Sequence, residues 1–154
     1  MSDDIQVRGA NTEDVVQVVK LLKLVFNDWP HIHIGGSSED YWRWKYTRYS
    51  NRPLETVLAE SDGEVIGVNH SYSVTIKIGD KILSCNHATD LGIHPDFRRL
   101  GIYPRLSEFK TALHKSTGCH LNYGITNIPR VIESSKVAGR PPFPHQVKAM
   151  MRVH

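Results

Sequence analysis

Residues 91–110 read LGIHPDFRRLGIYPRLSEFK, and this stretch joins three kinds of local structure. An apolar run ends at His94, a short basic loop follows over 98–103, and Pro104 begins an amphipathic helix. Main-chain N–H groups at a helix start have no partner within the helix, and the helix dipole favours an anion there. Gly101 lets the backbone approach a ligand closely, and Pro104 suits a first turn because its missing N–H costs nothing there. The stretch therefore predicts a strand, a phosphate-binding loop and a helix.

The loop and the run before it resemble the pyrophosphate loop of the GNAT superfamily of acyl-CoA-dependent N-acetyltransferases. That loop reads Gln/Arg-x-x-Gly-x-Gly/Ala, and Arg98, Gly101 and Tyr103 stand at its three pattern positions. Residues 93–98 match the hydrophobic-His-Pro-Asp-aromatic-Arg run that often precedes it. Tyr103 departs from the usual small residue, so we expect it to narrow the mouth of the loop. The alternative interpretation is an ordinary strand-turn-helix with a basic turn.

The composition fits a globular protein made of one domain, residues 1–154. Hydrophobic residues make up 40% and charged residues 23%, and the net charge of +3 argues against a dedicated nucleic-acid surface while allowing an anionic ligand. Cys85 and Cys119 lack metal-ligand spacing and favour a reduced setting. The N-terminus carries no signal-peptide pattern, and no apolar run is long enough to span a bilayer. We therefore expect a cytoplasmic protein without a membrane or nucleic-acid partner.

Apolar periodicity and turn residues predict the order β-α-α-β-β-β-α-β-α-β. We expect strands over 5–8, 56–60, 64–78, 81–93, 119–126 and 147–153, and helices from Asn11 to Trp29 and over 38–46, 105–116 and 127–137. The inner stripe of the third helix is predicted to be Leu106, Phe109 and Leu113. The middle strands form an antiparallel meander, and the strand over 119–126 returns through a helix as a parallel neighbour. The fold class is α/β (α+β): a GNAT-like, central, mixed and mostly antiparallel sheet flanked by helices.

The predicted order follows the superfamily from the first strand onward, except at its end. The superfamily usually has a further strand after the one that we expect over 147–153. Either the domain is truncated at its C-terminus, or a partner chain completes the sheet. An uncovered apolar edge favours association, so we expect a homo-oligomer.

Two other segments allow competing interpretations. His31 and His33, two residues apart, would share a face of a strand and could bind a metal, but no third ligand stands nearby. We expect a substrate-side loop there and no metal site. The aromatic and basic residues over 41–48 allow stacking on nucleic acid or a place in the core. The resemblance implies instead that the segment between the first two strands shapes the acceptor pocket.

The resemblance also implies where acyl-CoA would bind. In the superfamily the strand before the loop splays from its parallel neighbour, and its exposed backbone groups pair with pantetheine. Those groups here belong to Leu91, Gly92 and Ile93, and the N–H groups of residues 99–103 would bind the pyrophosphate. The loop residues are Arg98, Arg99, Leu100, Gly101, Ile102, Tyr103 and Pro104. Asn127, at the start of the next helix, matches a position that often contacts the CoA arm.

The general base has two candidates on the strand before the loop. Some relatives place a glutamate six residues before the last apolar contact of this strand, and His87 stands there. The even offset puts His87 and Ile93 on one face if no bulge intervenes, and histidine titrates near neutrality. Asp90 lies at an odd offset from Ile93, which places it on the opposite face of a regular strand. Its side chain would reach the site only if a bulge interrupted the strand. A hydrogen-bonded core histidine is the equal alternative for His87.

The general acid has no obvious candidate. Many relatives use a tyrosine a few residues before a Gly-Phe pair. Here that position is Ser135, a poor proton donor, and the pair reads Gly139-Arg140. Tyr103, Tyr123 or solvent would have to substitute.

These expectations lead to one function and two rivals. The chain is expected to transfer an acetyl group directly from acetyl-CoA, its co-substrate, to a primary amine on a small molecule or peptide. A non-catalytic acyl-CoA-binding or regulatory module is the first rival. An unrelated α/β phosphate-binding protein is the second, and the lack of a Walker Lys-Ser/Thr pair argues against it. The sequence leaves open a peptide N-terminus, a lysine, an amino sugar or a small amine as acceptor.

Overall fold

The structure is a computed structural model, and it describes residues 4–32, 35–48, 54–119, 121–126 and 133. The chain separates into two compact units, Met1–Gly124 and Ile125–His154. Every strand and almost every helical residue described below belongs to the first unit. Asn127, Ser135 and the strand predicted over 147–153 lie outside the described residues, and the helix predicted over 127–137 is described only at Glu133, which is helical.

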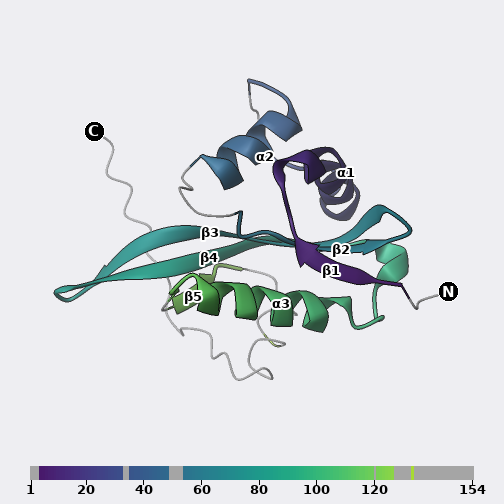
Figure 1. Cartoon of the computed structure of the whole chain (residues 1–154). Helices are drawn as coiled ribbons and strands as arrows, with labels where there is room; N and C mark the ends of the chain where they lie inside the picture. Colours follow the sequence, from purple (N-terminus) through teal and green to yellow (C-terminus); the bar gives the residue numbers. More distant parts are fainter. Residues whose placement is uncertain (1–3, 33–34, 49–53, 120, 127–132, 134–154) are drawn as a thin grey trace. The chain divides into compact units, whose positions relative to one another are not determined.

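The first unit confirms the predicted order through its eighth element. Its elements are β1 (Gln6–Gly9), η1 (Thr12–Asp14), α1 (Val15–Phe26), α2 (Ser38–Thr47), β2 (Val57–Ser61), β3 (Glu64–Ile78), β4 (Lys81–Ile93), η2 (Pro95–Phe97), α3 (Ile102–Ser116) and β5 (Leu121–Gly124). The sheet order is β1-β2-β3-β4-β5, with the first four strands antiparallel and β5 parallel to β4. Helices α1 and α2 cover one face of this sheet and α3 covers the other (Figure 1). The predicted mixed, mostly antiparallel sheet is therefore confirmed.

Side chains satisfy free N–H groups at η1, the 3-10 helix that leads into α1, and at the start of α2. Asn11 accepts from the N–H of Glu13, and the carboxylate of Asp14 accepts from the N–H of Asn11. Helix α2 begins at Ser38, as predicted, and Ser37 caps it by accepting from the N–H of Asp40. Short polar side chains thus cap the starts of η1 and α2.

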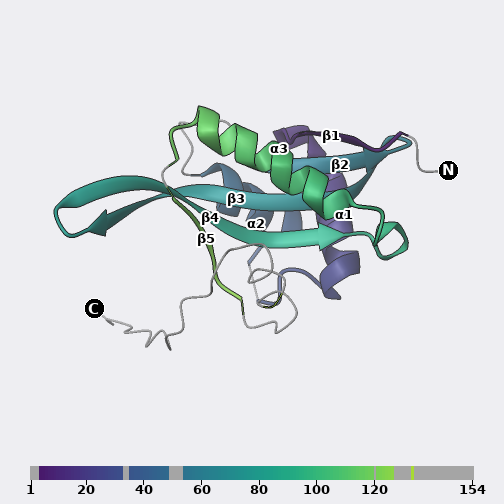
Figure 2. The same cartoon turned by 90° about the horizontal axis from the view of Figure 1, so that it is seen from below.

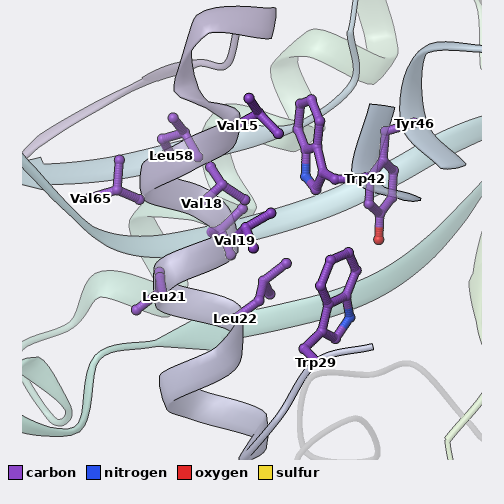
Figure 3. Packing of buried hydrophobic residues seen from close by; sticks show 11 residues of the cluster. Val15, Val18, Val19, Leu21, Leu22, Trp29, Trp42, Tyr46, Leu58 and Val65 are labelled. Carbon is purple, nitrogen blue, oxygen red and sulfur yellow. The ribbon is translucent and has the colours of Figure 1, made fainter. Parts of the chain in front are cut away.

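The core on the α1 and α2 side is built from a helical stripe and two aromatic rings. Val15, Val18, Val19 and Leu22 recur at the spacing of one helical face and are almost fully buried. They pack with Trp42 and other apolar residues of α2 and the sheet, as Figure 3 shows. Replacing a side chain such as Leu22 with alanine should cost about 2–5 kcal/mol of stability. This core holds α2 firmly over β3 and β4, where the candidate site lies.

Helix α3 differs from the prediction in its start and in its inner face. It begins at Ile102, after Gly101 in the left-handed conformation (φ 71°), so Pro104 is its third residue. Pro104 still lies in the first turn, where its missing N–H costs nothing. The inner stripe is Ile102, Leu106, Lys110 and His114, whereas Phe109 is exposed, so its predicted burial is wrong. A search for apolar residues at helical spacing favoured Phe109. It missed Lys110 and His114, two polar residues whose partners are buried.

These buried polar residues form a network between α3 and the sheet. The Lys110 ammonium donates to Oδ1 of Asn69 and to the carbonyl oxygen of His70, both at 2.6 Å. The imidazole Nε2 of His114 lies 3.1 Å from the hydroxyl of Ser71. When the side-chain amide of Asn86 is rotated by half a turn, its oxygen accepts from the same nitrogen of His114 at 2.6 Å. Because buried polar groups are costly unless paired, this network fixes the register of α3 on β3 and β4.

Candidate active site

A bulge interrupts β4 at Asp90. Asn69 of β3 faces Leu91 of β4, but the next residue, His70, faces Thr89, so Asp90 has no partner in the ladder. Asp90 has a φ of 39°, which is uncommon for a residue other than glycine and carries a conformational cost of about 1–2 kcal/mol. The extra residue turns the Asp90 side chain toward α2.

The bulge also changes which residues share a face. His87 lies opposite Tyr72, on the side covered by α1 and α2. Ile93 instead packs with Ile102 and Leu106 on the α3 side. The expectation that His87 and Ile93 share a face required an uninterrupted strand, and it is wrong because Asp90 adds one residue between them. The same bulge provides the condition under which Asp90 was expected to reach the site.

The Asp90 carboxylate is held by two residues of α2. Its Oδ2 lies 2.6 Å from the ammonium of Lys45 and 2.5 Å from the hydroxyl of Tyr46. Burial raises the pKa of the Asp90 carboxyl, but the hydrogen bond and charge of Lys45 outweigh it, so the pKa lies below its ordinary value. Burial and the charge of Asp90 raise the pKa of Tyr46 well above 10, which keeps its hydroxyl a donor. Asp90 is therefore an ionised, fixed carboxylate at neutral pH.

His87 lies between two tyrosines. Its Nδ1 is 2.7 Å from the hydroxyl of Tyr72 on β3. Its ring stacks on Tyr123 of β5, with centroids 4.8 Å apart and planes 7° from parallel. Burial, followed by the nearby charge of Lys45, lowers the pKa of His87, and Asp90 partly opposes this. The predicted residues His87 and Tyr123 thus meet, and His87 is a neutral imidazole at pH 7.

The loop after β4 leaves its main-chain donors available. Among the described residues, the N–H groups of residues 99–103 donate no hydrogen bond. Arg99 (φ 69°) and Gly101 (φ 71°) both adopt the left-handed conformation. The guanidinium Nε of Arg98 donates to the carbonyl oxygen of Ile93 at 3.3 Å and ties the loop to the end of β4. Free donors at the start of α3, close to basic side chains, suit an anionic group.

The edge of β4 next to this loop is open on the side of β5. The parallel pairing of β5 with β4 ends at Ala88 and Gly124. In Figure 2, β5 turns away while β4 continues toward Ile93. Over the described part of the chain, no strand pairs with this edge at Leu91, Gly92 or Ile93. These backbone groups and the loop donors together fit an extended acyl-CoA arm followed by its pyrophosphate.

Three site residues were missed in the sequence: Lys45, Tyr46 and Tyr72. Lys45 and Tyr46 were seen only as part of an aromatic and basic helix, because their contact with Asp90 depends on the bulge. Tyr72 could have been found, since it is the cross-strand partner of His87 once β3 and β4 are paired through the Gly79-Asp80 turn. His94 serves the turn after β4, where its Nδ1 accepts from the N–H of Asp96 at 3.3 Å.

Other features of the described residues lie apart from this site. A groove of about 310 Å³ lies beside α1 and is lined by Leu21, Leu24, Phe97 and others, none of which contacts His87 or Asp90. No three His, Cys, Asp or Glu side chains in the described ranges group closely enough to hold a metal ion, and His33 lies outside those ranges. None of the helices described here has both the length and the apolar character to cross a bilayer.

Comparison with known proteins agrees with this geometry. The family profile described as Acetyltransferase (GNAT) domain matches residues 6–126. The chain belongs to the GNAT acetyltransferase family. No curated protein sequence matches it significantly.

Solved structures of GNAT acetyltransferases share the fold at low sequence identity. AAC(6')-Iy in complex with the bisubstrate analog CoA-S-monomethyl-acetylneamine aligns with a TM-score of 0.76 and 15% identity, over 98% of this chain and 100% of that one. An acetyltransferase of Trypanosoma brucei aligns with 0.70 and 15%, over 96% and 100%. Glucosamine-6-phosphate N-acetyltransferase from Arabidopsis thaliana aligns with 0.69 and 14%, over 97% and 100%. At such identities the likeness establishes the fold alone.

Proposed function

We propose that this GNAT protein transfers an acetyl group directly from acetyl-CoA to a primary amine. The observation that carries the proposal is the open edge of β4 beside the free N–H groups of residues 99–103. Bound acetyl-CoA would supply a thioester whose carbonyl carbon forms a bond with the amine nitrogen while its bond to sulfur breaks. Leu91, Gly92 and Ile93 would hold the arm, and the loop from Arg98 to Pro104 would hold the pyrophosphate. Asn127 remains a proposed contact.

His87 is the proposed general base. A base must be unprotonated before the reaction, and the lowered pKa of His87 meets this condition at neutral pH. In the tautomer that serves this role, Nδ1–H donates to the Tyr72 oxygen and Nε2 accepts the proton of the amine. Asp90 is a weaker candidate, since Lys45 and Tyr46 already occupy its Oδ2 and its pKa is low. We assign Asp90 the role of a fixed negative charge that orients the site.

Tyr123 is the proposed general acid. It stacks on His87 and extends from β5 just before the pairing with β4 ends. Its phenol O–H can give the leaving thiolate a proton. Tyr103 is exposed on the first turn of α3 and remains the alternative donor, together with solvent.

The acceptor is proposed to be a primary amine on a small molecule or peptide. One structural relative is named a glucosamine-6-phosphate N-acetyltransferase, and another is in complex with the bisubstrate analog CoA-S-monomethyl-acetylneamine. At this identity they suggest which amines to test first. Amino sugars therefore open the panel, followed by lysine peptides, peptide N-termini and small amines.

Two measurements test the proposal. Calorimetry should show binding of acetyl-CoA, and loss of binding on reversing the charges of Arg98 and Arg99 would support the loop assignment. Thiol release with the amine panel should then show turnover. Binding without turnover on any amine would favour the non-catalytic acyl-CoA-binding module. No binding at all would overturn both assignments.

The proposal includes a single domain over 1–154, a cytoplasmic location and self-association. The single domain and the location rest on composition, and self-association rests on the predicted uncovered apolar strand edge. Light scattering of the purified chain tests the last, and a clean monomer would contradict the predicted homo-oligomer.

A further inference from the structure

His70 is joined by its side chain to α2 on one side and to the bulge on the other. The indole N–H of Trp42 donates to Nε2 of His70 at 2.8 Å, and both residues are fully buried. The Nδ1 of His70 lies 2.8 Å from the carbonyl oxygen of Asp90. An indole nitrogen can only donate and a carbonyl oxygen can only accept, so the tautomer is determined. Nε2 carries the lone pair, and Nδ1–H donates to Asp90.

The backbone of His70 is held from the opposite face of the sheet. The pairing of β3 with β4 shifts between Asn69 and His70, which is where Asp90 is left unpaired. Lys110 of α3 donates to the side chain of Asn69 and to the carbonyl oxygen of His70. Helices on both faces therefore contact the strand at the shift. From this point in β3, the imidazole of His70 reaches across to the main chain of Asp90 in β4.

We propose that His70 is a positioning residue for acetyl transfer: its Nδ1–H fixes the main chain of the β4 bulge. Through the bulge it sets the direction of the Asp90 carboxylate. It also sets which face of the sheet each of residues 91–93 takes along the open edge. The proposal rests on the proposed function, because the edge and Asp90 matter for transfer only if the chain is a transferase.

The physical reason is that the bulge competes with a regular strand. A regular register would remove the positive φ of Asp90 but would move every later residue of β4 to the opposite face. Within the bulge, the Asp90 carboxylate is held by Lys45 and Tyr46, and its carbonyl by His70. Without the Nδ1–H, the carbonyl would lose its donor next to a buried ring, and the main chain that leads to Leu91 would be free to rotate.

The imidazole keeps this role across the working pH range. Burial lowers the pKa of His70 to about 3, with Lys110 and Lys45 adding to the effect and the carbonyl and charge of Asp90 opposing it. The facing aromatic group, Tyr46, stacks on His70 with centroids 4.2 Å apart and adds no charge. His70 therefore acts by geometry and not by titration.

Two substitutions separate the two hydrogen bonds of His70. His70→Asn places an amide N–H near the position of Nδ1 and can donate to Asp90, but it cannot reach Trp42. His70→Gln places an amide oxygen near Nε2 and can accept from Trp42, but it has no donor for Asp90. The asparagine variant removes more buried volume, so it should be the less stable of the two. A purely structural role therefore predicts that asparagine is also the less active.

The positioning role predicts the reverse order. With acetyl-CoA and an amine that the native protein accepts, H70Q should lose about 100-fold in kcat/KM for acetyl-CoA, because both the Asp90 carboxylate and the backbone groups of residues 91–93 would be displaced. H70N should keep kcat/KM within about tenfold of the native value. Native kcat/KM in both variants, or a kcat/KM that follows their unfolding midpoints, would overturn the proposal.

A second measurement does not depend on activity. Amide hydrogen exchange over residues 86–93 should rise in H70Q and stay near native in H70N, because only H70Q loses the bond to Asp90. A native protein that turns over no amine would refute the proposed function, and this exchange pattern would still report on the bulge. Equal exchange in both variants would refute the role of the Nδ1 bond.

Discussion

The hydroxyl of Tyr72 lies 2.7 Å from Nδ1 of His87, and the two residues face each other across β3 and β4. In the tautomer in which Nδ1–H donates to the Tyr72 oxygen, the other ring nitrogen of His87 carries the lone pair and can take a proton from a substrate. When Nε2 is protonated, Nδ1–H still donates to the Tyr72 oxygen, so the same hydrogen bond serves both protonation states.

Replacing His87 with alanine should therefore remove the base. We expect kcat for acetyl transfer to fall by about 100-fold or more, and the acidic limb of its pH profile to disappear. Transfer rates that match the native protein across pH would remove His87 as the base and favour Asp90.

Replacing Lys45 with methionine should move the pH profile in a defined direction. The charge of Lys45 lowers the pKa of His87, and its loss also frees the negative charge of Asp90 to act on that ring. Both changes favour the imidazolium, so the acidic limb of kcat/KM should move to higher pH. Lys20→Met, which removes an exposed lysine paired with Glu64 at 3.4 Å, is the control and should not move it. A limb that stays in place would show that the limb does not report His87.

Gly101 and Gly118 flank α3 and form a matched pair. Both have a positive φ, 71° and 70°, and a Cβ at either would meet no atom within 4 Å. Alanine at either position should therefore cost about 1–2 kcal/mol from backbone strain alone. Only Gly101 lies among the free N–H groups of the loop, so only G101A should also weaken acetyl-CoA binding, by about tenfold. Calorimetry and urea unfolding on both variants separate the effects, and equal binding by both would argue against the loop as the pyrophosphate site.

Local sequence signals predicted the elements of the fold because each depends on neighbours in the chain. The Asp62-Gly63 turn, the long strands β3 and β4 and the capping box at Asn11 could all be recognised this way. The inner face of α3 could not, because the burial of Lys110 and His114 depends on acceptors supplied by β3 and β4. A pattern of apolar residues carries no information about such partners.

The candidate site was predictable only up to the bulge. His87 was proposed because it matches a position of the resembled superfamily, Asp90 as its rival on the same strand, and Tyr123 as a substitute acid. The structure brings His87 and Tyr123 into contact. A single extra residue in β4 decides which face each later side chain takes, and the residues next to Asp90 in the sequence give no sign of the bulge. The bulge depends on Trp42 and Lys45 from α2 and on His70 from β3, which lie 48 to 20 residues earlier in the chain.

The two buried histidines predict how stability depends on pH. Burial lowers the pKa of His70 to about 3 and, with Lys110, that of His114 to about 4. In the unfolded chain both should titrate near 6.5, so below that pH the unfolded state binds more protons than the folded state. The free energy of unfolding should then fall as the pH drops below about 6.5, by roughly 1 kcal/mol or more for each pH unit and each histidine. Above that pH these two groups should have no effect.

Urea unfolding between pH 7 and pH 5 tests this dependence. The substitution His114→Gln keeps an amide N–H near Nε2 for Ser71 and Asn86 but removes the titration. It should reduce the loss of stability over this interval, because His114 then contributes nothing while His70 and His87, whose pKa values are also lowered, still contribute. His31→Gln, at an exposed position, should leave the loss as in the native chain. An unchanged dependence in H114Q would mean that His114 takes up its proton in the folded state as readily as in the unfolded chain, and its buried contacts with β3 and β4 would have to open to allow it.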